Sequence, residues 1–472
     1  MVTPAHTPGS GLALTRRAAL GTLVAGAAGF ALLGPRGRQD IPHGRIVLDY
    51  WEKWTRHEGD AMENIVSAFN KSQSRIWVRY LVVSDIGQKS LVSIAGGNPP
   101  DLIGLYSLNV PAYAEAGAIL PLDQRAPAAG LSLDQYTPGV RRVMTHRGGW
   151  WATVNTAGSV ALYYNRAAFR DAGLDPDRPP RTIAELDAMH AKLIKRDASG
   201  KLERVGFLHR EPGWWSWLWA NHFGGRIYDE ATNKATINSP ECLRAMEWMQ
   251  TYARDLGIER LKTFAESFGN YFTPENPFLT GKVAMIIQGP WIANLIQKFK
   301  PNHDYGVAPF PTLAGAPVDA PVGLIDTDVL VIPRGAKNPD AAMEFIAFTQ
   351  RQDNTEQLAL AHCKPSPLAK VSESFLANHP NRGIRVHYDI FKSPGAYVPP
   401  RTRIWQQFKD EFDTQVQRLW RLDATPSAAL GDLQLRIQSL LDRSADQQLR
   451  RYGPASASAG GSGRDVGSGG AT

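Results

Sequence analysis

The chain contains 472 residues, of which 43% are hydrophobic and 21% are charged, and its formal net charge at pH 7 is +7. A typical domain has about 100–200 residues, so we expect at least two hydrophobic cores, and the composition excludes both a mostly disordered chain and a many-span membrane protein. The positive charge does not indicate a nucleic-acid groove, because four arginines lie in the first 40 residues and the other basic residues are scattered among acids.

The first 40 residues have the pattern of a signal segment. Arg16 and Arg17 precede an apolar run from Leu20 to Leu33, which is shorter than the roughly 20 residues that span a bilayer. Adjacent arginines before a mildly apolar run are typical of a twin-arginine (Tat) signal peptide. We therefore expect residues 1–40 to direct export to the periplasm or the outer face of the cell membrane. No cysteine follows the run to carry a lipid, and cleavage or retention of the segment stays open.

The next segment predicts a strand, a helix and a second strand. Residues 46–48 and 76–83 are β-rich, and between them apolar residues recur at helical spacing in 62–69. Such units build parallel sheets, whose ligands bind beyond the carboxyl ends of the strands. The expected loop from Trp51 to Glu58 is therefore a candidate site.

Helices and strands alternate through the rest of the chain. A capping box at Thr182 and Glu185, and a capping residue followed by proline at three later places, mark helix starts. The three places are Ser239-Pro240, Asn338-Pro339 and Thr425-Pro426, and strand-like runs lie at Val160–Tyr164, Val283–Ile287 and Val329–Ile332. The predicted class is α/β. Residues 454–472 are rich in Ala, Ser and Gly and predict a flexible tail.

Motifs for several enzyme classes are missing from the sequence. It has no P-loop, H-E-x-x-H, C-x-x-C or G-x-S-x-G pattern, and its two cysteines, Cys242 and Cys363, allow one disulfide without requiring it. A glycosidase needs only two carboxylates at suitable separation, so it remains the enzyme alternative. Conceivable carboxylates for that alternative are Glu52, Glu211, Asp326 and Asp328.

The chain has thirteen tryptophans, several of them close together in sequence. A pyranose has an apolar face that packs on an aromatic ring and a rim of hydroxyls that needs polar partners, so such residues favour a sugar site. Any one tryptophan can equally pack in the core. The groups are Trp51 with Trp54, Trp150 with Trp151, and Trp214, Trp215, Trp217 and Trp219.

A series of motifs follows in order from about residue 45 to 443. They are Tyr50–Trp54 and Ala68–Asn70; Gly97–Ile103 and Tyr113–Gly117; Tyr163–Phe169, Ala172–Leu174 and Pro180–Leu186; Gly281–Met285 and Gly289–Trp291; and Tyr305–Pro311 and Asn338–Ala342. Together they resemble the extracellular solute-binding proteins of carbohydrate ABC importers, the maltose-binding-protein-like family. Ile183 replaces the tryptophan usual in that family.

This resemblance implies a two-lobed periplasmic-binding-protein fold with hinge crossings and a central ligand cleft. The expected lobes are 41–157 with 324–370, and 158–323 with 371–453. The resemblance further implies that the protein is not an enzyme, that it has no catalytic residue, cofactor or metal ion, and that it acts as a monomer without nucleic acid. Its expected partners are a carbohydrate and the membrane permease of an ABC importer.

The resemblance also assigns candidate ligand contacts, each with core packing or a solvated position as the alternative. Trp291 falls on the family's Gly-Pro-Trp element, whose ring stacks on sugar, and Asp326 lies at an expected hinge crossing. The remaining candidates are Trp51, Glu52 and Trp54 after the first strand; Tyr106, Ser107 and Asn109 after the Pro-Pro-Asp strand; Trp214 and Trp215 before the Gly-Gly turn; and Arg401 and Trp405 after Pro399-Pro400. The stretch around Asn109 departs from the maltose-binding pattern, which argues against maltodextrin itself.

Other ligands and functions stay open at this point. An anionic sugar derivative such as glycerol 3-phosphate or a uronic acid would use Arg401 or Lys53 as its charge partner. The glycosidase alternative also stays open, as does a surface sugar-binding lectin that works without a transporter.

Overall fold

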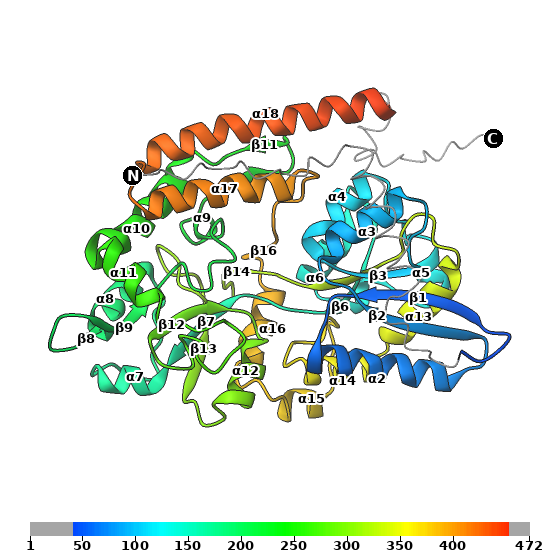
Figure 1. The fold of residues 1–472 in the computed structure, drawn as a ribbon, viewed down its shortest axis with the longest axis horizontal. Helices are drawn as coiled ribbons and strands as arrows, with labels where there is room; N and C mark the ends of the chain where they lie inside the picture. Colours follow the sequence, from blue (N-terminus) through cyan, green and yellow to red (C-terminus); the bar gives the residue numbers. More distant parts are fainter. Residues whose placement is uncertain (1–40, 453–472) are drawn as a thin grey trace, which may run out of the picture. The chain divides into compact units, whose positions relative to one another are not determined.

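The computed structural model describes residues 41–452 (Figure 1). The chain divides into two units, residues 1–45 and residues 46–472, and every helix and strand described below belongs to the second. The predicted signal segment, 1–40, and the predicted tail, 454–472, lie outside the described residues.

The first large sheet has the order β2-β1-β3-β15-β6. Its strands are β1 (Ile46–Glu52), β2 (Ile76–Val82), β3 (Leu102–Tyr106), β6 (Thr153–Thr156) and β15 (Asp328–Val331). Strand β1 pairs in parallel with β2 and β3, while β15 runs antiparallel to β3 and β6. The predicted β-α-β opening is confirmed, with the helix α2 (Arg56–Ser72) between β1 and β2.

Strand β1 is longer than the sequence indicates. Trp51 and Glu52 were expected in a loop, but they pair with Leu81 and Val82 of β2 as the last two residues of the strand. Parallel pairing continues here because β2 offers backbone partners along its whole length. The connection to α2 therefore shrinks to Lys53, Trp54 and Thr55.

The second large sheet has the order β13-β7-β12-β9-β8. Its strands are β7 (Ala161–Asn165), β8 (Lys195–Arg196), β9 (Leu202–Phe207), β12 (Val283–Gln288) and β13 (Tyr305–Ala308). Strands β9 and β12 are parallel, and every other pair is antiparallel. The strands predicted near residues 160, 283 and 329 are thus confirmed to within two residues.

Three chain segments connect the two sheets and bond to one another. The β14–β16 pair, Gly323–Leu324 with Ala396–Tyr397, joins the segment that enters β15 to the segment that leads into α17. Val160 N donates to Leu324 O at 2.8 Å, and Ile325 N donates to Tyr397 O at 2.8 Å. These bonds tie the crossing at 157–160 to the crossing at 325–327 and to the segment that leads into α17.

Helices pack around both sheets (Figure 1). Besides α2 they are α3 (Ile86–Ala95), α4 (Val110–Glu115), α5 (Arg125–Ala128), α6 (Pro138–Met144), α7 (Arg166–Asp171), α8 (Ile183–Leu193), α9 (Trp219–His222), α10 (Pro240–Leu256), α11 (Ile258–Ala265), α12 (Ile292–Phe299), α13 (Pro339–Thr349), α14 (Gln352–Ala361), α15 (Glu373–Ala377), α16 (Ile384–Lys392), α17 (Trp405–Trp420) and α18 (Pro426–Tyr452). Two 3₁₀ turns (Ser107–Asn109, Leu133–Gln135) and the two-residue strand pairs β4–β5 (Thr145–His146, Gly149–Trp150) and β10–β11 (Tyr228–Asp229, Lys234–Ala235) complete the described elements. Helices α17 and α18 lie side by side (Figure 1).

The predicted helix starts are confirmed, and one uses a different bond. The capping box of Thr182 and Glu185 opens α8, and the Ser239 side chain accepts from Cys242 N at the start of α10. At α13, however, the Asn338 side chain does not cap the helix. Its backbone N–H donates to Asp101 Oδ1 at 2.8 Å instead, which fastens the helix to the loop before β3.

Buried side chains form two clusters. One contains side chains of the first sheet together with nearby Trp54 and Ile325, and extends onto the second sheet through Tyr163, Ile286 and Tyr305, while the other lies largely on the second sheet and includes Trp215 and Trp405. Cys242 and Cys363 are both buried and free, so the disulfide left open by the sequence is absent. Within residues 41–452, no helix is both long and apolar enough to cross a membrane.

Candidate ligand-binding site

Four aromatic side chains gather beside the second sheet. The ring centroids of Trp214 and Trp215 lie 5.4 Å apart, and those of Trp291 lie 6.4 Å and 6.1 Å from them. Tyr271 contacts Trp214 with a centroid distance of 4.7 Å. Trp215 Nε1 also donates to Asp326 Oδ2 at 3.3 Å, so the aromatic group reaches the crossing between the sheets.

The sheet topology explains why these rings meet. Trp291 follows β12 and precedes α12, while Trp214 and Trp215 lie in the loop after β9. Because β9 and β12 are parallel neighbours, their carboxyl ends reach the same edge of the sheet. Gly289 leaves room for the Trp291 ring, since a Cβ at that position would lie 2.2 Å from ring carbon Cη2.

A second group of side chains lies at the edge of the first sheet. Asp328 opens β15 opposite Tyr106, the last residue of β3, and Lys53 follows the neighbouring strand β1. Lys53 Nζ lies 3.0 Å from Asp328 Oδ1, and Lys364 Nζ lies 2.9 Å from Asp328 Oδ2. The Thr156 hydroxyl donates to the same Oδ2 at 2.8 Å.

Lysine side chains join the two groups. Lys364 Nζ lies 5.6 Å from the Trp54 ring and 5.7 Å from the Trp291 ring, and Lys53 Nζ lies 4.7 Å from the Tyr106 ring. Ammonium groups at these distances are attracted to the ring faces. We call the combined set the central cluster: Lys53, Trp54, Tyr106, Trp214, Trp215, Trp291, Asp326, Asp328 and Lys364.

Two further carboxylates, one buried and one half-buried, pair with the lysines. Glu52 has no exposed surface, and it accepts from Lys53 Nζ at 3.1 Å and from the Tyr50 hydroxyl at 2.5 Å. Glu58 Oε1 lies 3.6 Å from Lys364 Nζ. The lysine charges of the central cluster are therefore balanced within the protein.

The two aspartates of the central cluster have opposite electrostatics. Burial and the nearby charge of Asp328 raise the pKa of Asp326 to about 6. Burial would also raise the pKa of Asp328, but Lys364 and Lys53 outweigh it and hold that pKa well below its usual range. Burial likewise opposes the charge of Lys53, yet Asp328 and Glu52 raise the pKa of its ammonium.

The structure brings half of the sequence-predicted site residues together. These are Trp54, Tyr106, Trp214, Trp215, Trp291 and Asp326. Trp214 and Tyr106 are 36% and 47% exposed, whereas Trp54 and Trp215 are buried. The parts of the cluster open to a ligand are therefore mainly the rings of Trp214 and Tyr106 and the half-buried side chains of Trp291 and Asp326.

The other predicted residues lie elsewhere. Trp51 alternates with Tyr50 and Glu52 along β1 and packs against the first core cluster. Glu52 is buried beneath Lys53 and offers no atom to a ligand here. Ser107 is buried, and the Asn109 side-chain oxygen has no hydrogen-bond partner within the described chain.

Arg401 and Trp405 were predicted to act together, but the structure separates their environments. Arg401 Nε lies 3.4 Å from Glu230 Oε1, and the Arg401 residue lines a cavity outside the central cluster. Trp405 is 2% exposed and packs edge-on against Trp217, with ring centroids 5.1 Å apart. Its ring belongs to the second hydrophobic core and presents no free face for stacking on a sugar.

Sequence reasoning missed or undervalued four residues at the site. Lys364 and Tyr271 follow no recognisable motif, and Lys53 was considered only as a partner for an anionic ligand. Asp328 was weighed only as a glycosidase carboxylate, although its position opposite Tyr106 makes it an anchor for two lysines. The pairing of β15 with β3 is the information that would have found it.

Comparison with known proteins places the chain in a family. Residues 53–356 match the family of bacterial extracellular solute-binding proteins. The sn-glycerol-3-phosphate-binding periplasmic protein UgpB of Pectobacterium atrosepticum is 24% identical over 444 residues, covering 88% of this chain and 94% of that protein. The maltotriose-binding protein of Pyrococcus abyssi is 22% identical over 321 residues, covering 67% of this chain and 65% of that protein.

Solved structures share the fold. The CpMnBP1 protein with mannobiose bound superposes with a TM-score of 0.73 at 27% identity, covering 83% of this chain and all of that chain. UgpB of Mycobacterium tuberculosis in complex with glycerophosphocholine gives a TM-score of 0.67 at 21% identity, covering 86% of this chain and all of that chain. The two sheets and their connecting segments are thus the two-lobed arrangement of substrate-binding proteins, which bind solutes without turning them over. The chain belongs to the bacterial extracellular solute-binding proteins.

Proposed function

We propose that this protein binds a neutral carbohydrate in the central cluster and delivers it to the permease of an ABC importer. The observation that carries the proposal is the meeting of Trp214, Trp215 and Trp291 with the carboxylate of Asp326. Aromatic faces pack on the apolar side of a sugar ring, and a carboxylate beside them accepts hydrogen bonds from its hydroxyls.

The charge balance of the central cluster favours a neutral ligand. Lys53 and Lys364 both bond to Asp328, and each has a further glutamate behind it. An incoming anion would have to compete with these carboxylates, whereas sugar hydroxyls can donate to Asp326 and accept from the lysines. Glycerol 3-phosphate, the ligand named for one set of relatives, is therefore the second candidate for this cluster.

Two relatives support carbohydrate as the ligand class. The maltotriose-binding protein and the mannobiose-bound CpMnBP1 share the family or fold of this chain, and each is named with a short oligosaccharide. Stacking surfaces on neighbouring tryptophans suit more than one sugar ring, and we propose an oligosaccharide of a few rings.

The position of site residues beside both large sheets supports a closing mechanism. Trp54 follows β1 of the first sheet and Trp215 follows β9 of the second, so a ligand that touches both favours the arrangement in which they are close. We propose that residues 41–157 with 324–370, and 158–323 with 371–453, act as the two lobes. Helix α16 contacts α6 of the first proposed lobe, and its His387 Nε2 lies 2.8 Å from the Tyr163 hydroxyl of β7 in the second, which supports a position for this helix where the two lobes meet.

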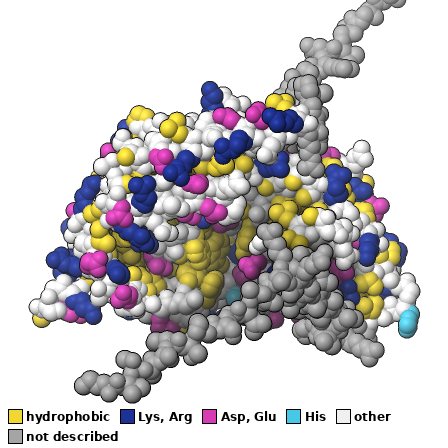
Figure 2. All heavy atoms as spheres, turned by 45° about the horizontal axis from the view of Figure 1, so that its top comes forward, with side chains coloured by type: hydrophobic (Ala, Val, Ile, Leu, Met, Phe, Trp, Pro, Cys, Tyr) yellow, Lys and Arg dark blue, Asp and Glu magenta, His cyan; other side chains and the backbone are white. Residues whose placement is uncertain are grey.

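The remaining proposals concern where the protein acts and with what. The apolar run after Arg16 and Arg17 supports twin-arginine export to the periplasm or the outer face of the cell membrane, where the permease would receive the ligand. On the face that Figure 2 shows, basic and acidic side chains are interspersed, which supports the absence of a nucleic-acid partner, and we propose that the protein acts as a monomer. Replacing Arg16 and Arg17 together by lysine should retain the protein in the cytoplasm, as fractionation would detect.

Titration calorimetry of residues 41–472 with mannobiose, maltotriose and glycerol 3-phosphate tests the ligand class. We expect saturable binding of a neutral oligosaccharide whose affinity changes little between 50 and 500 mM salt, because a neutral ligand has no charge to screen. Binding of glycerol 3-phosphate alone, weakened by salt, would replace the carbohydrate with the second candidate.

A further inference from the structure

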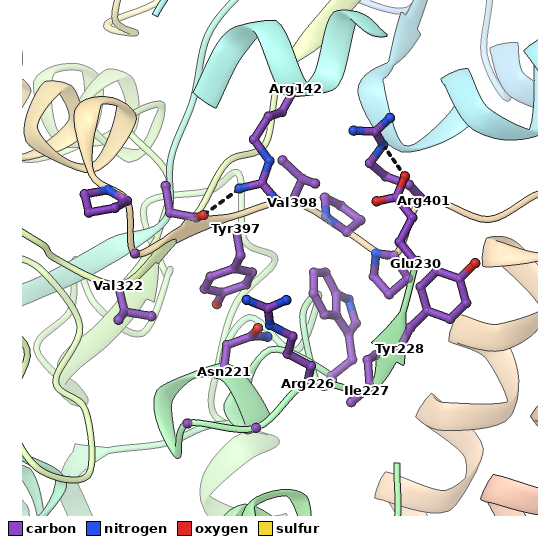
Figure 3. Close-up of a pocket in the computed structure, with 18 residues that line it drawn as sticks. Arg142, Asn221, Arg226, Ile227, Tyr228, Glu230, Val322, Tyr397, Val398 and Arg401 are labelled. Atoms are coloured by element: carbon purple, nitrogen blue, oxygen red, sulfur yellow. Dashed lines mark hydrogen bonds and ion pairs between the residues drawn. The ribbon is translucent and has the colours of Figure 1, made fainter. Parts of the chain in front are cut away.

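A cavity of about 320 Å³ lies outside the central cluster and is rich in arginine (Figure 3). Its lining includes Arg142 from α6, Arg226 from the segment after α9, and Arg401 from the segment between α16 and α17. Trp217 and Tyr397 also line the cavity. No member of the central cluster lines it, so the two sites are built from different residues.

The three arginines face one cavity. Arg142 and Arg226 point toward each other across it, and Arg401 lies beside Glu230 (Figure 3). Burial lowers the pKa of Arg142, and the nearby charges of Arg401 and Arg226 lower it further. The guanidinium groups are therefore close enough to repel one another.

Acidic residues balance these charges only in part, with the Glu230 charge acting on Arg142 and the Arg226 charge acting on Asp229. Glu230 is the one acidic residue in the lining, and its Oε1 lies 3.4 Å from Arg401 Nε without the geometry of a hydrogen bond. Arg142 Nη1 donates to the backbone oxygen of Ala396 at 2.9 Å. Within residues 41–452 the Arg226 guanidinium makes neither an ion pair nor a side-chain hydrogen bond.

This arrangement contrasts with an ordinary solvated arginine patch. Arg401 Nε is buried and unsatisfied, and a buried donor without a partner is costly. The cavity also has an aromatic wall, which lowers the local dielectric and strengthens attraction to a negative charge. An oxygen anion in the cavity would satisfy the free donors and relieve the repulsion among the arginines.

We propose that this cavity binds the carboxylate or phosphate group of a small solute through Arg142, Arg226 and Arg401. Planar guanidinium groups bond such groups in pairs of parallel hydrogen bonds, which selects for planar or tetrahedral oxyanions over halide ions. Tyr397 and Trp217 pack against whatever carbon skeleton carries the charge.

The anion has two conceivable sources that share this chemistry. It can be a free anion such as inorganic phosphate, or the acidic group of a uronic acid or sugar phosphate. The cavity has its own lining residues, so the proposal stands or falls independently of the carbohydrate proposal for the central cluster.

Calorimetric titration with inorganic phosphate and with D-glucuronate, at 50 mM salt, tests the assignment. Arg226→Gln is the principal variant, because the Arg226 side chain is exposed and makes no ion pair or side-chain hydrogen bond in the described chain, so its loss should not disturb folding. We expect it to weaken binding of both anions about tenfold or more, as for loss of a charge-assisted hydrogen bond. Glu230→Gln should strengthen binding several-fold, since it removes the negative charge that competes for Arg401.

Arg178→Gln provides the matched control. Arg178 is 75% exposed and lies 3.7 Å from Glu185, so this variant changes net charge equally without touching the cavity. The proposal is overturned if neither anion binds the wild type, or if Arg178→Gln weakens binding as much as Arg226→Gln. A neutral oligosaccharide titrated on the same variants should bind unchanged, which separates this outcome from a failure of the carbohydrate site.

The same titrations distinguish the two sources of the anion. Phosphate that binds equally with and without saturating neutral oligosaccharide identifies a site for a free anion. A second result would be that glucuronate competes with the neutral oligosaccharide and that both Arg226→Gln and Trp291→Ala weaken its binding. This result identifies one acidic solute that reaches both regions. Either result supports the arginine site.

Discussion

The central cluster and the arginine cavity are two polar regions that differ in how far their charged side chains are paired within the protein. In the central cluster each lysine is held by Asp328 and backed by a glutamate, so its charges are satisfied before any ligand arrives. In the arginine cavity three guanidinium groups share one glutamate. The number of charged residues near a site therefore says little about its ligand, because what matters is which charges lack a partner.

The largest expected effect concerns the anchor of the central cluster. Asp328→Asn leaves Lys53 and Lys364 buried with a much weaker partner, and breaking a buried ion pair in this way costs about 3 kcal/mol or more of unfolding free energy. Urea unfolding should show this loss, while Arg226→Gln in the arginine cavity should be nearly neutral. Equal stability of Asp328→Asn and wild type would mean that the lysines are not held as described.

The second prediction concerns stacking on tryptophan. Trp291→Ala should weaken oligosaccharide binding by about 2 kcal/mol or more, the usual cost of losing an aromatic hot spot, and leave phosphate binding in the arginine cavity unchanged. Trp151→Ala serves as a control, because that half-buried ring packs outside the central cluster. Titration calorimetry on both variants measures the difference, and equal affinity of Trp291→Ala and wild type would remove this ring from the site.

The third prediction concerns pH. The pKa of Asp326 is about 6, above the ordinary unfolded value of about 4, so the folded protein holds the proton more tightly. The contribution of the Asp326 carboxyl to the free energy of unfolding is therefore lost as pH rises from about 4 to 6. Asp326→Asn, which mimics the neutral acid, should be more stable than wild type at pH 7 by about 1 kcal/mol, and the advantage should shrink at pH 4.5.

Asp326→Asn also sharpens the functional role of that carboxylate. If the ionised form accepts from sugar hydroxyls, the variant should bind oligosaccharide more weakly at pH 7 despite its greater stability. The charges of Asp328, Lys364 and Lys53 also act on the pKa of Asp326, and the substitution leaves all three groups in place. A variant that gains stability and keeps full affinity would show that Asp326 does not contact the ligand.

The smallest effect on binding is expected at Trp405. Its ring packs in the second core against Trp217, so Trp405→Phe should leave oligosaccharide affinity unchanged and cost about 1 kcal/mol of stability through lost contacts. Calorimetry paired with urea unfolding separates the two quantities. A loss of affinity without a loss of stability would restore the ligand-binding role that the sequence motif predicted for this residue.

The sequence predicted the elements better than the site. Short β-rich runs and helix caps such as Thr182 identify strands and helices because those signals are local. The end of β1 was misplaced because continued pairing of Trp51 and Glu52 depends on β2, which lies more than twenty residues further along the chain. Local patterns carry no such information.

Trp214, Trp215 and Trp291 were predicted as site residues from the family resemblance. The structure supplies the physical reason that they meet, since they follow β9 and β12, two parallel strands that end at one edge of the sheet. Lys364 enters the site from the segment after α14, and its role depends on a contact with Asp328 that only the folded chain shows. Trp405 illustrates the converse, since a motif position cannot reveal that a ring faces a hydrophobic core.

A crystal structure of the protein with the neutral oligosaccharide that calorimetry identifies would test the central claim most directly. The account predicts a sugar ring stacked on Trp291, with a hydroxyl donating to Asp326 and the arginine cavity free of sugar. A sugar held by Arg142, Arg226 and Arg401, with Trp291 making no contact, would contradict it.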